Sequence, residues 1–455
     1  MLIVDVETFR DYFLIGFKNT ETGKYAAFEM FEGQPLKINR VRELMGSSTT
    51  VSFNGNGYDL FMIAYALQGA TCEKLKSLSD AIIKSNLPPW RVARDRDVSI
   101  PRQWRHIDTI EVAPGKASLK IYGGRLHFKT MQDLPLKPDD SVAPEMRETI
   151  RLYNRNDLDT TQALLDVLMP AIELREQMGK QYGGIELRSK SDAQIAEAVI
   201  RHELVALTNE EYRPKRIEPG EIVRYEDPGI IEFRTLQLRQ IFRRILDEGF
   251  PIATNGSVRM PDWLAKTQIK IGGGLYQMGI GGLHSCEHAQ SIVAADDEML
   301  LDVDVASYYP SIILKLKLAP ESMGVDFTRV YQSLVTRRLY AKAMGDKVTA
   351  DTLKITLNGS FGKLGSMYSI FYAPALMIQT TITGQLGLLM LIERLNAAGM
   401  RVVSANTDGV VILCKKAQQA ELDAVTFEWM MDTSFELERS DYSALHSRDV
   451  NNYIA

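Results

Sequence analysis

The chain has 455 residues, of which 45% are hydrophobic and 24% are charged. This length exceeds what one hydrophobic core normally serves, so we expect two or three domains, and the apolar content excludes disorder as the main state. The formal net charge of −5 excludes a protein that coats nucleic acid by bulk charge alone, although basic residues can still line one cleft.

Residues 1–170 alternate between strand-like and helix-like segments. The apolar run Leu2–Val4 predicts a strand that ends in acidic residues, and Val51–Phe53 predicts a second strand, followed by the glycine-rich turn Asn54–Gly57. Apolar residues at helical spacing predict a helix over residues 146–168. Strands that alternate with helices indicate an α/β domain.

From residue 171 the predicted elements are mainly helical. Ser191 and Asp192 can cap a helix that continues to Leu207, and residues 235–246 predict a basic amphipathic helix. The glycine cluster at Gly272–Gly282 predicts a domain junction.

The last third mixes strands and helices, as in an α+β domain. The predicted elements are a strand at Met299–Val305, a helix after Pro310, a long helical stretch to residue 366, a helix at Thr381–Ala397, and a hairpin formed by Arg401–Ala405 and Val410–Cys414.

Acidic residues occur at three places in the first region. Asp5 and Glu7 share one face of the first strand, because side chains at i and i+2 of a strand point the same way. Asp59 closes the turn after the second strand, and Asp157 follows Tyr153 by one helical turn. Each acidic residue alone is more often solvated surface charge. Together they favour a magnesium site, since hydrolysis of phosphodiesters with two metal ions needs several converging carboxylates.

Two further aspartates lie beside strands in the last third. Asp304 ends a predicted strand and precedes Ser-Tyr-Tyr-Pro, which favours a metal ligand beside an aromatic platform; the alternative is a capping residue on a buried strand. Asp408 lies in a tight turn between two apolar strands, where an ordinary Asp-Gly hairpin turn is the common alternative.

One predicted helix between these aspartates carries a mixed polar and aromatic face. Lys354, Asn358 and Phe361 fall at i, i+4 and i+7, and this cation, amide and ring suit a triphosphate, a sugar and a base. Arg338 and Lys342 are also one turn apart, and they fit a second phosphate clamp and a solvated basic face equally well.

The acidic motifs of the first region resemble those of the proofreading exonuclease of family B DNA polymerases, D-x-E, N-x₂₋₃-(F/Y)-D and Y-x₃-D, in the same order. The resemblance implies a ribonuclease H-like exonuclease domain with two Mg²⁺ ions. It implies that the two ions are bound by Asp5, Glu7, Asp59 and Asp157. It also implies that Tyr153 orients the attacking water, and that Asn54 or Asn56 helps to hold the single-stranded 3′ end.

The later motifs resemble polymerase motifs A (D-x-x-S-L-Y-P-S), B (K-x₃-N-S-x-Y-G) and C (D-T-D-S) of the same family, and the glycine cluster is similar to the Y-x-G-G linker of bacteriophage members. The resemblance implies a palm with an antiparallel sheet, helical fingers, and two Mg²⁺ ions, or Mn²⁺ as an alternative, held by Asp304 and Asp408. It places Tyr309 under the sugar, Arg338, Lys342 and Lys354 near the phosphates, and Asn358 and Phe361 at the base pair.

The chain departs from these motifs at a few positions. Tyr308 replaces a leucine in motif A, Phe361 lacks the usual tyrosine hydroxyl in motif B, and Asn406 replaces the first aspartate of motif C. Asn406 lacks a charge, so we do not count it as a metal ligand. The interval between motifs A and B is too short for the large insertion of protein-primed family members. The resemblance therefore favours a nucleic-acid primer.

The resemblance also implies domain boundaries. We expect an exonuclease domain at 1–170, a helical connecting region and linker at 171–290, palm segments at 291–325 and 367–455, and fingers at 326–366. The final residues are similar to the K-x-Y primer-binding motif with Asn in place of Lys, which gives Tyr453 a DNA contact. We expect the thumb to be absent. Three explanations stay open: a split gene whose second polypeptide supplies the thumb, an interrupted gene, or a fragment.

The sequence therefore predicts a DNA-directed DNA polymerase with 3′–5′ exonuclease activity, whose partners are primer-template DNA and deoxynucleoside triphosphates. Two alternatives stay open: an exonuclease with an inactive polymerase half, and a DNA-binding subunit of a split polymerase. The basic stretches 90–106 and 234–244 are candidates for DNA contact, with solvated surface as the alternative.

The cellular compartment is predicted from the sequence signals that this sequence does not contain. The N-terminus has no secretory pattern, and no run of about 18 uncharged apolar residues occurs, so we expect no membrane partner. The three cysteines match no metal-ligand spacing and indicate a reducing compartment. We expect a cytoplasmic protein, in the host cytoplasm if a bacteriophage encodes it.

Overall fold

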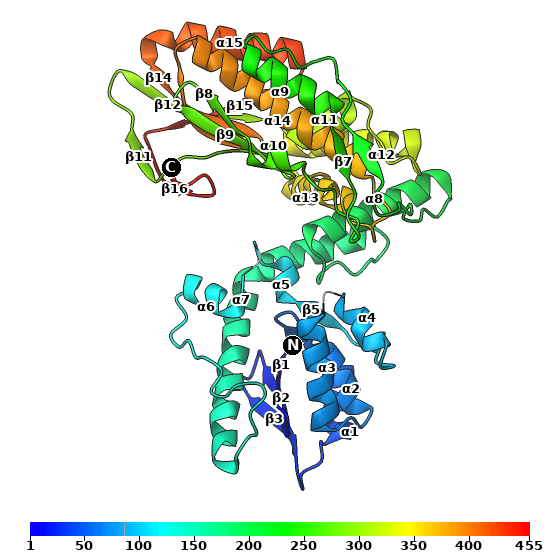
Figure 1. Cartoon of the computed structure of the whole chain (residues 1–455). Coiled ribbons are helices and arrows are strands. Elements are labelled where there is room, and N and C mark those ends of the chain that lie inside the picture. Colours follow the sequence, from blue (N-terminus) through cyan, green and yellow to red (C-terminus); the bar gives the residue numbers. More distant parts are fainter. Residues whose placement is uncertain (86, 116) are drawn as a thin grey trace. The chain divides into compact units, whose positions relative to one another are not determined.

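The computed structural model describes residues 1–85, 87–115 and 117–455, and the chain forms two compact units, Met1–Ser191 and Asp192–Ala455. We call these the first and second units (Figure 1). The last long helix of the first unit, α7 (Arg147–Gln181), continues through Pro170. The predicted boundary at residue 170 therefore falls inside a helix, and the units divide after Ser191.

The first unit is built on a five-stranded sheet in the order β3-β2-β1-β4-β5. The first three strands are antiparallel, and β4 and β5 run parallel to β1. Helix α7 lies on one face of this sheet and α1–α3 lie on the other (Figure 1). The strands are β1 (Leu2–Thr8), β2 (Tyr12–Asn19), β3 (Tyr25–Phe31), β4 (Thr50–Ser52) and β5 (His106–Asp108), and the helices are α1 (Ile38–Ser47), α2 (Asp59–Leu67), α3 (Cys72–Lys84), α4 (Pro89–Arg94), α5 (Thr109–Val112), α6 (Leu119–Arg125) and the 3₁₀ turn η1 (Pro144–Met146).

The alternation of β1 decides which side chains face α7. Val4 and Val6 pack against α1–α3, whereas Ile3 packs against α7. Asp5 and Glu7 have the parity of Ile3, so they face α7. The prediction that they share one face is confirmed, although β1 continues to Thr8 and both residues lie within the strand.

The second unit is built on a seven-stranded sheet in the order β15-β12-β14-β13-β10-β9-β8. One face packs against α9, α14 and α15, and together they form the main core (Figure 1). These elements are β8 (Gln268–Ile271), β9 (Gly274–Met278), β10 (Leu283–Ser285), β12 (Glu298–Val305), β13 (Arg401–Asn406), β14 (Gly409–Lys415), β15 (Leu437–Tyr442), α9 (Leu236–Asp247), α14 (Pro374–Ala397), the 3₁₀ turn η2 (Lys416–Gln418) and α15 (Gln419–Thr433).

The glycine cluster at Gly272–Gly282 forms part of this sheet, so its assignment as a domain junction is wrong. Gly272 has a φ of 56° in the turn between β8 and β9, a conformation that glycine adopts without strain. The following glycines lie in β9 and in the turn to β10.

A helical group packs beside the sheet of the second unit. It has its own core, to which α8, α11, α12 and α13 contribute. These helices are α8 (Asp192–Thr208), α11 (Tyr308–Lys315), α12 (Gly324–Met344) and α13 (Lys347–Leu364). The long helical stretch predicted up to residue 366 is therefore two helices, separated by Gly345 with a φ of 74°. The helix predicted after Pro310 begins at Tyr308 and has the proline in its first turn, where no N–H is needed.

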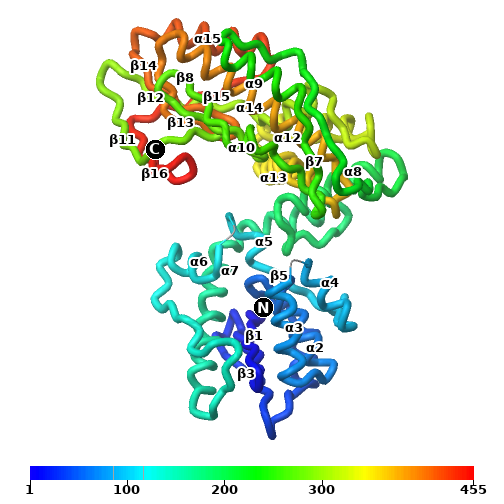
Figure 2. Tube along the Cα trace, viewed as in Figure 1, coloured from blue at the N-terminus to red at the C-terminus, as the bar shows by residue number. Residues whose placement is uncertain are grey.

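A small three-stranded sheet covers part of the face of the main sheet that is opposite to α14. Its strands are β11 (Gln290–Val293), β16 (Ala444–Asp449) and β17 (Asn452–Ile454), and the red end of the chain in Figure 2 follows β16 and β17. Ile292 and Leu445 pack on Leu300 and Val403 of the main sheet. The remaining elements are β6 (Ile222–Arg224), β7 (Gly249–Pro251) and α10 (Asp262–Lys266).

Helix α14 is the most apolar long helix of the second unit. Among the described residues it is the one helix that is long and apolar enough to cross a membrane, and 83% of its apolar window is buried inside the protein. Its neighbours in the core are the sheet and α15. The burial is that of a core helix.

Candidate active sites

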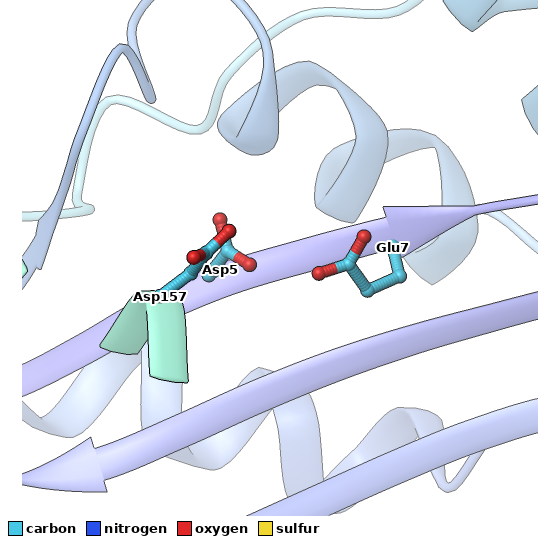
Figure 3. Close-up of side chains that lie close together, drawn as sticks. All are labelled: Asp5, Glu7 and Asp157. Atoms are coloured by element: carbon cyan, nitrogen blue, oxygen red, sulfur yellow. The ribbon is translucent and has the colours of Figure 1, made fainter. Parts of the chain in front are cut away.

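Three carboxylates of the first unit meet between β1 and α7. Candidate ligand oxygens of Asp5, Glu7 and Asp157 all lie within 4.8 Å of one another (Figure 3). Asp5 and Glu7 come from β1, and Asp157 comes from the α7 face that packs on this strand. The structure thus brings together three of the four predicted ligands of the first unit.

The fourth predicted ligand, Asp59, lies next to this group at the start of α2. Its Oδ1 accepts a hydrogen bond from the Val6 backbone N–H, at 3.2 Å. The preceding turn is held by Asp108, whose carboxylate accepts from the backbone N–H groups of Asn54 and Asn56 at 2.7 and 2.8 Å. Both asparagine side chains are exposed, and Asn54 has a φ of 64°.

Burial and mutual repulsion dominate the electrostatics of this cluster. Burial, followed by the neighbouring Glu7, raises the pKa of Asp5 well above its ordinary value. Burial and then Asp157 raise the pKa of Glu7 to about 8, and burial and then Asp108 raise the pKa of Asp59 to about 7. Carboxylates that repel one another in this way fit a bound divalent cation, and an all-oxygen donor set suits Mg²⁺ or Mn²⁺.

Helix α7 supplies two more polar groups to the cluster. Asn154 Nδ2 donates to Asp5 Oδ2 at 2.7 Å and to Glu7 Oε1 at 3.4 Å. Tyr153 lies beside Asp157, and burial together with that carboxylate raises the pKa of its hydroxyl. From α6, Lys120 is close enough to Asp157 to oppose the rise in the pKa of that carboxyl.

In the second unit, Asp304 and Asp408 lie together at one end of the β12–β14 ladder. Asp304 pairs with Gly409 in the antiparallel register, and the Val305 N–H donates to the Asp408 carbonyl at 2.8 Å. Partial burial, Asp302 and Asp408 raise the pKa of Asp304 to about 6. The approach depends on glycine, because a Cβ at Gly409 would lie 1.8 Å from Asp304 Oδ1.

A cavity of about 420 Å³ opens from this pair toward α12 and α13. Its acidic wall is formed by Asp304, Asp408 and Glu438, and Glu438 is directly opposite Asp304 on β15. Its other walls contain the following predicted nucleotide-binding residues: Tyr309, Arg338, Lys342, Lys354 and Asn358. Carboxylates thus face a group of cations across one cavity.

The aromatic residues of the predicted nucleotide site are in contact. The Tyr309 and Phe361 rings lie 4.3 Å apart between centroids, and the Tyr309 hydroxyl donates to the Gly281 carbonyl at 2.5 Å. Arg338 Nη1 donates to Ser307 Oγ at 2.9 Å, and Ser307 has a φ of 49°. Phe361 therefore reaches the site through Tyr309 and is not part of the cavity wall.

Asp304 and Asp408 also line a second cavity of about 170 Å³ on the side of β16 and β17. Asp302, Asn406 and Tyr453 contribute to its wall. Tyr453 lies close enough for the Asp302, Asp304 and Asp408 charges to raise the pKa of its hydroxyl, after the larger effect of burial. The predicted DNA contact Tyr453 therefore lies beside the acidic pair.

No family model matches this chain, and no curated protein matches it. Its structure is similar to that of the family B DNA polymerase from the hyperthermophilic archaeon Pyrobaculum calidifontis, with a TM-score of 0.51 and 15% sequence identity. The match covers 99% of this chain and 58% of that polymerase. The fold is that of part of a family B DNA polymerase. The chain spans 58% of the length of the polymerase that it matches.

Within this polymerase fold, the two basic stretches differ in their surroundings. Trp90 is half exposed, and the Arg94 guanidinium lies 5.4 Å from its ring centroid. In the second stretch, Arg234 pairs with Glu428 and Arg244 covers the Trp263 ring, so these side chains contact their own unit. Trp90 and Arg94 stay candidates for DNA contact.

Sequence reasoning missed several groups at the two sites: Asp108, Lys120, Asn154, Asp302 and Glu438. Asn154 follows Tyr153 directly, and Asp302 shares the parity of Asp304 on one strand, so local spacing could have indicated both. Asp108 and Glu438 reach their partners only through strand pairing between distant segments.

Proposed function

We propose that this chain is a DNA-directed DNA polymerase that adds deoxynucleotides to a primer 3′ end and removes nucleotides by 3′–5′ exonuclease action. One observation carries the proposal: each unit has its own acidic cluster, and the cluster of the second unit faces a cationic cavity. The polymerase fold supports the same conclusion. The substrates are primer-template DNA and deoxynucleoside triphosphates.

In the first unit, Asp5, Glu7, Asp59 and Asp157 would hold two Mg²⁺ or Mn²⁺ ions. When bound, the ions supply a nucleophilic oxygen and charge neutralisation for phosphodiester hydrolysis. Asn154 orients two of the carboxylates through its amide. Tyr153 would orient the attacking water beside Asp157, and the exposed Asn54 and Asn56 side chains would contact the DNA 3′ end.

In the second unit, Asp304 and Asp408 would hold the divalent cations of the palm. Lys354, Arg338 and Lys342 bind the triphosphate from the opposite wall, because cations stabilise the charge of the transferring phosphoryl group. Tyr309 lines the same cavity as Asp304, with its ring tilted against that of Phe361, and would form the floor under the sugar. A 2′-hydroxyl would meet this ring, so we expect discrimination in favour of deoxynucleotides.

The test separates the two activities in the full-length chain. We expect Asp5→Asn to reduce degradation of single-stranded DNA by at least about 100-fold, because loss of a ligand exceeds the roughly 10–100-fold cost of losing an outer-shell group. Incorporation of nucleotides should be unchanged. Asp304→Asn should give the converse result. Asp166→Asn on the exposed side of α7 and Glu298→Gln on β12 are charge-matched controls.

An Asp304→Asn variant that incorporates nucleotides at the parental rate would reject the palm assignment. An Asp5→Asn variant that still degrades single strands would reject the exonuclease assignment.

A second candidate function is a nuclease whose polymerase half is inactive. It is favoured by Asn406 and by the packing of the acidic groups. The oxygens in the first unit lie within 4.8 Å of one another, and no comparable group of three occurs elsewhere in the described residues. In this case Asp304→Asn would change no measurable activity. Bacteriophage origin, a second polypeptide that supplies a thumb, and a cytoplasmic location stay predictions from the sequence.

A further inference from the structure

Strand β12 carries a carboxylate that the proposed function does not use. Asp302 lies two residues before Asp304 and therefore on the same face of the sheet. It lines the 170 Å³ cavity together with Asp304 and Asp408. Its charge contributes to the raised pKa of both aspartates, after the effect of their partial burial.

Asp302 is held in place from the neighbouring strand. The Tyr442 hydroxyl at the end of β15 donates a hydrogen bond to Asp302 Oδ2 at 2.6 Å. A carboxylate that accepts a short hydrogen bond keeps a defined orientation and retains its second oxygen for another partner. The rotation of Asp302 away from the cavity is therefore restricted.

The same cavity is also lined by an amide, that of Asn406. Asn406 pairs with Gly409 across β13 and β14, and Gly409 pairs with Asp304 across β14 and β12, so Asn406 and Asp304 lie on one row of the sheet. Asn406 Oδ1 accepts a hydrogen bond from Thr407 Oγ1 at 3.1 Å. On this row the neutral Asn406 lies two strands from Asp304, and the additional charge of Asp302 lies two residues before Asp304 on β12.

A buried hydroxyl at the cavity points independently to a polar occupant. Ser447 on β16 lines the cavity, is only 6% exposed, and its Oγ has no hydrogen-bond partner among the described residues. A buried hydroxyl without a partner is costly, and a hydrated cation would provide oxygen partners for it. The carboxylates of Asp302, Asp304 and Asp408, which line the same cavity, favour a positively charged occupant.

We propose that Asp302 is a further carboxylate of the palm, and that it supplies, from β12, the negative charge toward a divalent cation that Asn406 does not carry on β13. The inference rests on the proposed function, because Asp304 and Asp408 remain the principal ligands. Asp302 acts as a positioning residue: its charge and its free oxygen hold the hydrated cation on the Ser447 side of the pair.

The test measures cation binding directly. The full-length chain carries Asp5→Asn and Asp157→Asn, so that the first unit does not contribute, and Mn²⁺ binding is followed by electron paramagnetic resonance and calorimetry. We expect Asp302→Asn to weaken Mn²⁺ binding roughly 10-fold, in the range found for outer-shell partners of metal ligands. Glu298→Gln, which removes the same charge from the same strand outside the cavity, should leave Mn²⁺ affinity unchanged.

A second experiment moves the negative charge from position 302 to position 406. Asn406→Asp, added to Asp302→Asn, should restore most of the lost Mn²⁺ affinity, whereas Asn406→Asp alone should give a smaller gain. Without metal, Asp302→Asn should not lower the unfolding temperature, because the amide still accepts from Tyr442 and one repulsive charge is removed. A merely structural role of Asp302 would instead lower the unfolding temperature and leave Mn²⁺ affinity unchanged.

The outcomes separate this inference from the proposed function. Parental Mn²⁺ affinity in Asp302→Asn, together with a loss in Asp304→Asn, overturns the role of Asp302 and leaves the palm assignment intact. Parental affinity in Asp304→Asn overturns the palm assignment itself. If Asp302→Asn does not fold, the single variant Asn406→Asp decides: a gain of roughly 10-fold would mean that no other residue supplies the missing charge.

Discussion

Among single residues, His106 shows most directly how burial changes protonation. Its ring lies on β5 between two hydroxyls, with Nδ1 2.9 Å from Thr50 Oγ1 and Nε2 3.1 Å from Ser52 Oγ. Burial lowers its pKa to about 4. The two hydroxyls satisfy the neutral ring, whereas no carboxylate stabilises the charged one within the described contacts.

The lowered pKa of His106 predicts acid sensitivity of the first unit. The unfolded histidine has a pKa of about 6.5, so unfolding takes up a proton between pH 6.5 and 4. The contribution of His106 to stability is complete above pH 6.5 and is lost as the pH falls, up to about 3 kcal/mol. Urea unfolding at pH 7.5 and 5 should show a smaller loss in His106→Gln than in the parent protein. An equal loss in both proteins would contradict the assignment.

The parent protein must be compared with His106→Gln, because other groups change the stability with pH in the opposite direction. The pKa values of Glu7 and Asp59 are raised to about 8 and about 7, so their contribution to stability decreases as the pH rises through this range. The parental curve alone contains both effects, and the difference between the proteins isolates His106.

Gly409 allows a second prediction at the scale of one residue. A Cβ at this position would lie 1.8 Å from Asp304 Oδ1, so Gly409→Ala must displace the carboxylate. A displacement of about 1 Å can cost about 100-fold in rate, and we expect a loss of incorporation of this size. Gly273→Ala, in open space at the turn between β8 and β9, is the matched control. Primer-extension rates distinguish the two, and normal extension by Gly409→Ala would contradict the placement of Asp304.

At the scale of elements, the packing of β2 against α7 positions the carboxylate cluster of the first unit, which is the proposed exonuclease site. A Cβ at Gly16 on β2 would lie 1.8 Å from Asn154 Oδ1, and Asn154 holds Asp5 and Glu7. We expect Gly16→Ala to reduce single-strand degradation by about 100-fold without altering a carboxylate. Gly46→Ala on the exposed surface of α1 should leave degradation unchanged and stabilise the helix by about 0.5–1 kcal/mol.

The sequence allowed the parts of each site that lie within one element to be predicted. Tyr153 and Asp157 follow from helical spacing, as do Lys354 and Asn358, and the structure has each pair on one helix. The β13–β14 hairpin was equally local, because two apolar strands flank a two-residue turn. Helical spacing and the residues typical of tight turns can be recognised in a short stretch of sequence, without reference to the rest of the chain.

Sequence patterns did not reveal what depends on pairing between distant segments. Asp108 holds the turn at Asn54 because β5 adds to β4, and Tyr442 reaches Asp302 because β15 adds to β12. The glycine cluster was misassigned for the same reason, since its strands join the main sheet only where β10 pairs with β13. Sheet register is a property of the folded chain and was not visible in local composition.

For the whole molecule, the two units have separate cores and should unfold in separate transitions. Ile63 and Leu389 are both fully buried, one in each unit. Truncation of such a residue costs about 2–5 kcal/mol, so Ile63→Ala should lower one calorimetric transition and Leu389→Ala the other. Added Mg²⁺ should affect the two transitions separately: Asp5→Asn should change the effect of Mg²⁺ on one calorimetric transition, and Asp304→Asn should change its effect on the other. A single transition that both truncations shift together would contradict independent units.

Helix α7 has a consequence for how this protein can change over evolutionary time. Asn154 and Asp157 approach β1 from one side of a continuous helix that extends for several turns beyond them. Each residue advances an α-helix by about 100°, so inserting or deleting a single codon between the two would swing one of them out of the cluster. Descendants of this chain can exchange amino acids along that segment, but gaps in their alignments should fall before or after it.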